Sequence, residues 1–157
     1  IVKADQEFFM RGLDAAAAVI HGRNSAEQPT APTRKRLIAT RKIEALAPIS
    51  GQPNILHWNP QGASAEEVLR RLGVASGEIA IIGGTDIFGL FLPRYDVVHL
   101  TRANRVRLPG GRPVFPGVPE QAPEALLTAA GLTSGEPHPL DTARDVNVIT
   151  WRRSGDA

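Results

Sequence analysis

The 157-residue chain contains no cysteine, which excludes a thiol nucleophile, a disulfide framework and any thiolate-bound metal. The sequence also has no large excess of either charge: 18 Lys and Arg nearly balance 16 Asp and Glu, which gives a net charge of +2. So small an excess predicts no nucleic-acid partner and no membrane partner. No apolar run is as long as a membrane span, and no signal-like segment opens the sequence. The absence of cysteine fits a cytoplasmic protein.

The side chains that bind transition metals most often are scarce, with four histidines and no cysteine. The histidines lie far apart without the spacing of a ligand set, so the sequence predicts no metal site. Their positions are His21, His57, His99 and His138.

The length suits one domain with an ordinary hydrophobic core, and we expect residues 1–157 to form a single domain.

Short apolar, β-branched runs alternate with helical patterns along the chain, which indicates an α/β fold. The strongest helix signal is the capping box that begins at Ser64, with Gly73 as the stop. The loop 108–123 is rich in Pro and Gly and is expected either to edge a pocket or to carry a dimer contact. Helices are expected over 5–12, 64–73, 85–92 and 124–130, and strands over 16–21, 36–40, 54–58, 79–82, 97–101 and 146–151.

A glycine pair, Gly83-Gly84, follows the apolar run 79–82 and precedes a helical pattern. Paired glycines let a ligand approach the backbone, and a following helix offers free N–H groups to a phosphate. The segment lacks the third glycine of a Rossmann fingerprint. Taken alone, the pair favours a plain tight turn over a cofactor site.

Basic and hydroxyl side chains follow two predicted strands. Arg23 and Ser25 come after the strand that ends at His21, and Thr40 with Arg41 ends the strand that starts at Arg36. Either pair alone is typical of a solvated loop. Two neighbouring strand ends of this kind together favour a clamp for a 2′-phosphate.

Several segments taken in order resemble dihydrofolate reductase. They are Asp5-x-x-x-Phe9, Val19 to Ser25, Arg34 to Arg41, Ile81 to Phe88, and Leu92-Pro93 through His99-Leu100-Thr101. The chain is similarly close to the reductase domain of the bacterial riboflavin-pathway deaminase-reductase, which is echoed in the segment Gly110 to Gly117. The resemblance implies the dihydrofolate reductase-like three-layer fold, with a central, mostly parallel mixed sheet and helices on both faces.

The same resemblance implies an NADPH site. Gly83, Gly84 and Thr85 would meet the pyrophosphate, with Ile82, Asp86 and Ile87 beside them. Thr40 and Arg41 would hold the 2′-phosphate. The remaining residues implied to line the cofactor groove are Gly22, Arg23, Asn24 and Ser25.

For the substrate, the resemblance implies Asp5 as the acid that binds or protonates a pterin or pyrimidine ring, with Thr101 as its partner. The alternative for Asp5 is an ordinary helix N-cap. Phe9 and Phe88 would contact the substrate. Arg34 would grip a glutamate carboxylate, or else belongs to a basic loop with its two neighbours.

Two hypotheses remain open. The first is an NADPH-dependent reductase whose substrate is dihydrofolate or the ribosylamino-pyrimidine of riboflavin synthesis. The second is an NADPH-binding protein without turnover, because the strand, loop and proline-tryptophan segment that precede the acid-bearing helix in the family are not found here. A homodimer is possible under either hypothesis.

Overall fold

The computed structural model describes residues 2–23 and 33–154. The chain forms two compact units, Arg11–Phe88 and Ile1–Met10 with Gly89–Ala157, whose boundaries fall within two helices. We call them the five-stranded unit and the antiparallel unit. The prediction of a single domain stays a prediction. None of the helices in the described part of the chain is long and apolar enough to span a membrane.

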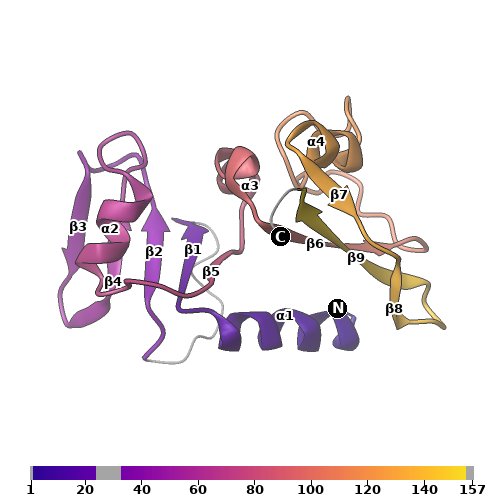
Figure 1. The fold of residues 1–157 in the computed structure, drawn as a ribbon, viewed down its shortest axis with the longest axis horizontal. Helices are drawn as coiled ribbons and strands as arrows, with labels where there is room; N and C mark the ends of the chain where they lie inside the picture. Colours follow the sequence, from indigo (N-terminus) through magenta and orange to yellow (C-terminus); the bar gives the residue numbers. More distant parts are fainter. Residues whose placement is uncertain (1, 24–32, 155–157) are drawn as a thin grey trace. The chain divides into compact units, whose positions relative to one another are not determined.

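The five-stranded unit has a mixed, mostly parallel sheet in the order β3-β4-β2-β1-β5 (Figure 1). All its neighbours pair in parallel except β3 with β4. The inner strands are mainly apolar, as is usual in a parallel sheet, and Ile20 and Leu37 are almost completely buried. The strands are β1 (Ala18–Gly22), β2 (Arg36–Ala39), β3 (Leu46–Ile49), β4 (Gln52–Trp58) and β5 (Ile79–Ile81).

Helix α2 (Ala65–Arg71) lies over one face of this sheet (Figure 1). Ser64 caps its first turn, because its hydroxyl accepts a hydrogen bond from the Glu67 N–H at 3.2 Å. Gly73 ends it with a φ of +82°. The Val74 N–H then bonds the Leu69 carbonyl at 2.9 Å, which is the Schellman arrangement. Both predicted ends of this helix are confirmed.

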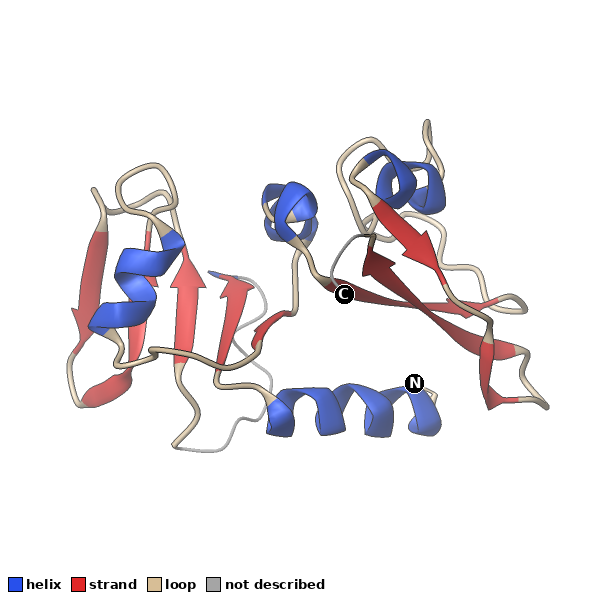
Figure 2. Cartoon of the chain, in the orientation of Figure 1, coloured by secondary structure: helices blue, strands red, loops and turns tan. Residues whose placement is uncertain are grey.

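The antiparallel unit has β6 (Val97–Ala103), β7 (Leu132–Ser134) and β8 (His138–Asp141) paired with β9 (Val146–Arg153). Helix α4 (Pro123–Ala129) lies against β7. Figure 2 shows the long loop between β6 and α4 without regular structure, as predicted. The buried apolar residues of this unit are Phe91, Phe115, Leu127, Leu132, Val146, Val148 and Trp151.

The fold class is confirmed, and several element boundaries are corrected. Helix α1 (Lys3–Ala15) does not stop at Gly12, because Leu13 beyond it is buried and packing outweighs the cost of one exposed glycine. Helix α3 (Thr85–Leu90) ends earlier than expected, and Pro93 lies inside a 3-10 turn, η2 (Leu92–Arg94). Strands β3, β7 and β8 were not predicted.

Candidate functional site

The parallel strands of the five-stranded unit end at one edge of the sheet. Their register pairs Gly22 with Ala39 and Ala39 with Trp58, so these strand ends are neighbours. β5 is parallel to β1 as well, and its chain continues into Gly83-Gly84. Predicted cofactor residues from three distant segments therefore meet at this edge. We define Gly22, Thr40, Arg41, Gly83 and Gly84 as the strand-end site.

The three glycines of the site are in direct contact. The Gly22 N–H donates to the Gly83 carbonyl at 2.7 Å, and a Cβ on Gly22 would lie 3.4 Å from the Gly84 nitrogen. Gly83 has a φ of +114°, a conformation that side chains other than glycine's rarely adopt, and a Cβ there would lie 3.0 Å from the Phe88 ring. The Gly83–Gly84 peptide bond is cis. A glycine is therefore required at position 83, both by the positive φ of its backbone and by the closeness of the Phe88 ring.

Gly84 is different, because it is exposed and no atom lies within 4 Å of a Cβ built on it. Its carbonyl accepts a hydrogen bond from the Phe88 N–H at 2.9 Å. Helix α3 has only six residues, so its dipole is weak and the backbone amides themselves must supply any attraction for an anion. The open space at Gly84 is where a ligand can approach the backbone.

The turn after β2 is tied to the sheet. The Thr40 N–H donates to the Trp58 carbonyl at 2.8 Å, and the Thr40 hydroxyl accepts from the Lys42 N–H at 3.2 Å. Asn59 holds the far end of the turn, donating from Nδ2 to the Ile43 carbonyl at 2.8 Å. The Thr40 hydroxyl keeps its own proton for a further acceptor.

Sequence reasoning missed the two residues that support this turn, Asn59 and Gly62. A Cβ on Gly62 would lie 1.8 Å from the Glu44 carbonyl oxygen, so the turn packs directly on a glycine. Both occur in the segment Asn59-Pro60-Gln61-Gly62, which reads as an ordinary loop. Only the turn signal was visible in the sequence.

Two basic residues follow β2 in this turn. Arg41 and Lys42 are exposed, and neither has an ion-pair partner within residues 2–23 and 33–154. A 2′-phosphate carries close to two negative charges and three acceptor oxygens, which a guanidinium and a hydroxyl can bind. Arg23 is exposed at the end of β1. Asn24 and Ser25 lie outside the described residues.

Behind Gly22, the buried His21 contacts the partly exposed Arg36, a pairing that the sequence did not reveal. His21 is 1% exposed. Its Nδ1 lies 2.9 Å from the Gly22 carbonyl, and its Nε2 lies 3.3 Å from Nη1 of Arg36. Burial lowers the pKa of His21, although the bond to Gly22 opposes this effect, and the charge of Arg36 lowers it further. Burial first, and then the charge of Arg34, lower the pKa of Arg36.

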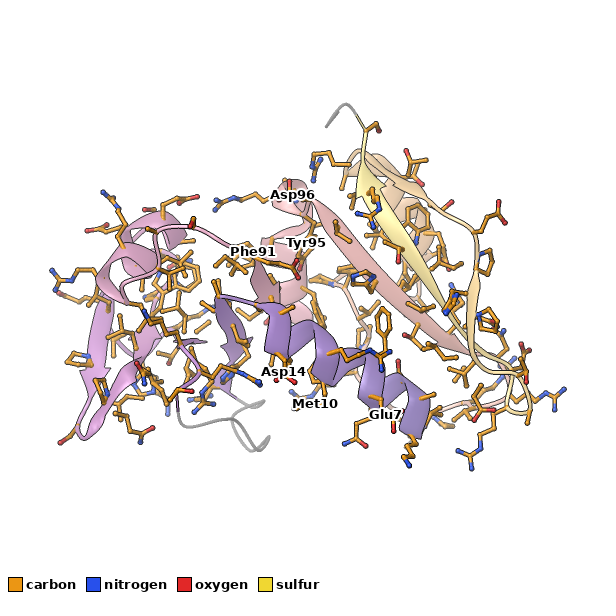
Figure 3. All side chains as sticks on the ribbon, turned by 60° about the horizontal axis from the view of Figure 1, so that its bottom comes forward. Glu7, Met10, Asp14, Phe91, Tyr95 and Asp96 are labelled. Atoms are coloured by element: carbon orange, nitrogen blue, oxygen red, sulfur yellow. The ribbon has the colours of Figure 1, made fainter. Side chains whose placement is uncertain are left out.

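Arg34 is not a solvated loop residue. Its side chain is 9% exposed, and its Nη2 donates to Asp14 Oδ1 at 2.7 Å. Figure 3 shows Asp14 near the end of α1. The other terminal nitrogen, Nη1, is buried without a hydrogen-bond partner in the described structure. The guanidinium therefore has capacity for one more acceptor.

The remaining substrate candidates belong to the antiparallel unit, except Phe88, which packs beside Gly83 in the five-stranded unit. Asp5 lies inside the first turn of α1, which begins two residues earlier, so the N-cap interpretation is wrong. One turn later, the Phe8 ring meets the His99 ring edge-on at 5.1 Å. Thr101 follows on the same strand face as His99. Asp5 and Thr101 thus flank one contact between α1 and β6. Phe9 is half-buried.

Two solved structures share this architecture. The first is a dihydrofolate reductase from Enterococcus faecalis complexed with NADP(H) and RAB-propyl, with a TM-score of 0.62 and 19% identity over 98% of this chain and 83% of that one. The second is a diaminohydroxyphosphoribosylaminopyrimidine deaminase/5-amino-6-(5-phosphoribosylamino)uracil reductase from Thermotoga maritima. Its TM-score is 0.61 at 15% identity over 94% of this chain.

This chain spans about half, 48%, of the Thermotoga protein. No protein-family model and no curated protein matches the sequence. The structural likenesses show that the chain has the dihydrofolate reductase-like fold, as the sequence motifs predicted. At these identities the likeness concerns the fold alone.

Proposed function

We propose that this protein is an NADPH-dependent reductase that binds the dinucleotide at the strand-end site. The observation that carries the proposal is the convergence of Gly22, Thr40, Arg41 and the open Gly84 backbone on one edge of a parallel sheet. Ligands of open α/β sheets bind at the carboxyl ends of the strands. The Enterococcus structure of the same fold is complexed with NADP(H), which supports the choice of cofactor.

Within this proposal each part of the site has a separate task. The Gly83-Gly84 backbone holds the pyrophosphate, because the absence of side chains lets phosphate oxygens approach the amides. Thr40 and Arg41 bind the 2′-phosphate, which NADH lacks. Thr85, Asp86 and the Ile82 and Ile87 side chains flank the nucleotide. When bound, NADPH supplies a hydride from its nicotinamide ring.

The substrate is proposed to be a pterin or pyrimidine. Asp5 holds the ring and provides the proton that must accompany the hydride, and Thr101 orients the Asp5 carboxylate. The Phe8–His99 contact supports this role, because it fixes the helix turn next to Asp5 against the strand that carries Thr101. Dihydrofolate and the phosphoribosylamino-pyrimidine are the two substrates to be compared.

The first experiment is a titration of the protein with NADPH and with NADH. We expect NADPH to bind at least tenfold more tightly, a difference of about 1.4 kcal/mol, and Arg41→Ala to abolish the preference. Arg71→Ala is the matched control, because Arg71 is also exposed but lies at the end of α2, away from the strand-end site. Failure of both nucleotides to bind would refute the proposal.

Turnover separates a reductase from a cofactor-binding protein without activity. We expect consumption of NADPH when one of the two substrates is supplied, and its loss in Asp5→Asn with NADPH affinity unchanged. If NADPH binds but neither substrate is reduced, the protein is a binding protein of this fold.

Arg34 distinguishes the two substrates. If dihydrofolate is reduced, Arg34→Ala should raise KM for it, because the substrate would lose a charge-assisted hydrogen bond from the guanidinium to its glutamate carboxylate. Asp14→Asn is the control: it breaks the same ion pair but keeps the guanidinium. A rise in KM that appears equally in both variants would reflect the lost ion pair and would argue against a carboxylate site.

A further inference from the structure

Two hydrogen bonds made by Gly22 connect the strand-end site to a buried histidine. The ring of His21 bonds the Gly22 carbonyl at 2.9 Å. The Gly22 N–H bonds the Gly83 carbonyl at 2.7 Å, and the next carbonyl, that of Gly84, accepts from α3. Gly22 therefore contacts both the His21 ring and Gly83 of the strand-end site.

The contacts of His21 define its protonation state. Nε2 faces an N–H donor of Arg36 at 3.3 Å, and because a guanidinium cannot accept a hydrogen bond, Nε2 must be the acceptor. Nδ1 then carries the proton and donates to the Gly22 carbonyl. The ring is neutral in this arrangement. A second proton would set two donors and two positive charges against each other inside the sheet.

We propose that His21 is a pH-sensitive positioning residue of the nucleotide site. The neutral ring holds Gly22 and, through it, Gly83-Gly84 in the geometry that accepts a pyrophosphate. Protonation breaks the bond between Nε2 and Arg36, displaces the ring and weakens nucleotide binding. This inference rests on the proposed cofactor site and adds a residue behind it that does not touch the ligand.

Arg36 on β2 is the charged group in contact with the ring among the described residues. Arg34 acts on Arg36 and is itself paired with Asp14 of α1. On the other neighbouring elements, Glu78 before β5 and Asp86 on α3 are exposed, and neither bonds the ring. Screening by solvent keeps these two acids from offsetting the direct conflict with Arg36.

The test compares NADPH affinity at about pH 7.5 and about pH 5.5 in the wild type and in His21→Asn. Asparagine retains an amide donor near the Nδ1 position but does not titrate, so it should rescue binding at low pH. We expect the wild type to lose more affinity than the variant, by less than about tenfold, since one proton limits the change to about tenfold per pH unit and the pKa of His21 is lowered.

Two controls isolate the effect of His21. The 2′-phosphate of NADPH itself titrates at about pH 6, and its contribution to the pH dependence of binding is the same in the wild type and in His21→Asn. His57→Asn alters the histidine two strands away in the same row of the sheet and should retain the wild-type pH dependence. Circular dichroism at both pH values checks that each protein is folded.

The amide resonances of Gly83 and Gly84 provide a readout that needs no nucleotide. We expect them to shift with the titration of the His21 ring in the wild type and to stay constant in His21→Asn. If NADPH does not bind but these resonances follow His21, the proposed function fails and the coupling stands. If the resonances do not move, or if both proteins lose NADPH affinity equally at low pH, the inference is overturned.

Discussion

Adding a single methyl group at Gly84 tests the nucleotide site with little disturbance of the fold. No atom lies within 4 Å of a Cβ built at this position, so Gly84→Ala should change the free energy of unfolding by no more than about 0.5 kcal/mol. The same methyl occupies the space through which a phosphate oxygen must reach the backbone. Loss of one hydrogen bond to a charged group costs about 1.5–3 kcal/mol, which is roughly a tenfold to hundredfold loss of NADPH affinity.

The assay pairs denaturant unfolding with an NADPH titration. Gly12→Ala is the matched control, since its Cβ also meets open space but lies on α1. It should leave NADPH affinity unchanged and stabilise the helix by about 0.5–1 kcal/mol. Gly83→Ala should instead destabilise the protein, because of its φ of +114° and the Phe88 ring 3.0 Å from its Cβ. Wild-type NADPH affinity in Gly84→Ala would refute the idea that phosphate approaches this backbone.

Three other substitutions test the surrounding structure. Gly62→Ala should destabilise the protein by about 1–3 kcal/mol and weaken discrimination of NADPH from NADH, because its Cβ would collide with the Glu44 carbonyl; an unchanged melting temperature would contradict this packing. Ser64→Ala should cost about 1 kcal/mol by removing the cap of α2, as measured by urea unfolding. Burial alone would raise the pKa of Glu124, but the hydrogen bonding with Arg102, a backbone hydrogen bond and the charge of Arg102 together lower it. A lowered pKa means that this stabilisation is present above the unfolded value of 4.5 and is lost at lower pH. Glu124→Gln should therefore lower the free energy of unfolding slightly at neutral pH, by less than about 1 kcal/mol because the pair is partly exposed, and not at about pH 3, as measured by urea unfolding at both pH values.

The elements that the sequence predicted are those with a local signal. The apolar run 79–82 with Gly83-Gly84, and the capped helix that starts at Ser64, depend on neighbours a few residues apart. β3 and β8 were missed because each contains a proline, Pro48 or Pro139, which argues against a strand. Both are edge strands, where the missing N–H costs no ladder hydrogen bond.

The candidate site likewise has one part that can be read from the sequence and one part that depends on the fold. The residue types at the strand ends, a glycine pair and Arg or Thr after apolar runs, can be read directly from the chain. That they form one edge depends on parallel register between strands far apart in sequence, and no local pattern specifies that register.

Local sterics and hydrophobic pattern were enough to indicate most of the strands and helices and the glycine pair at positions 83 and 84, but not β3, β7, β8 or the need for Gly62. The tertiary structure alone decided the partners of the buried polar groups. His21 meets Arg36 and Arg34 meets Asp14 only after β1, β2 and α1 have packed. The physical reason is that burial, which lowers the pKa of His21 and leaves one Arg34 nitrogen unsatisfied, is a property of the assembled sheet and not of any segment.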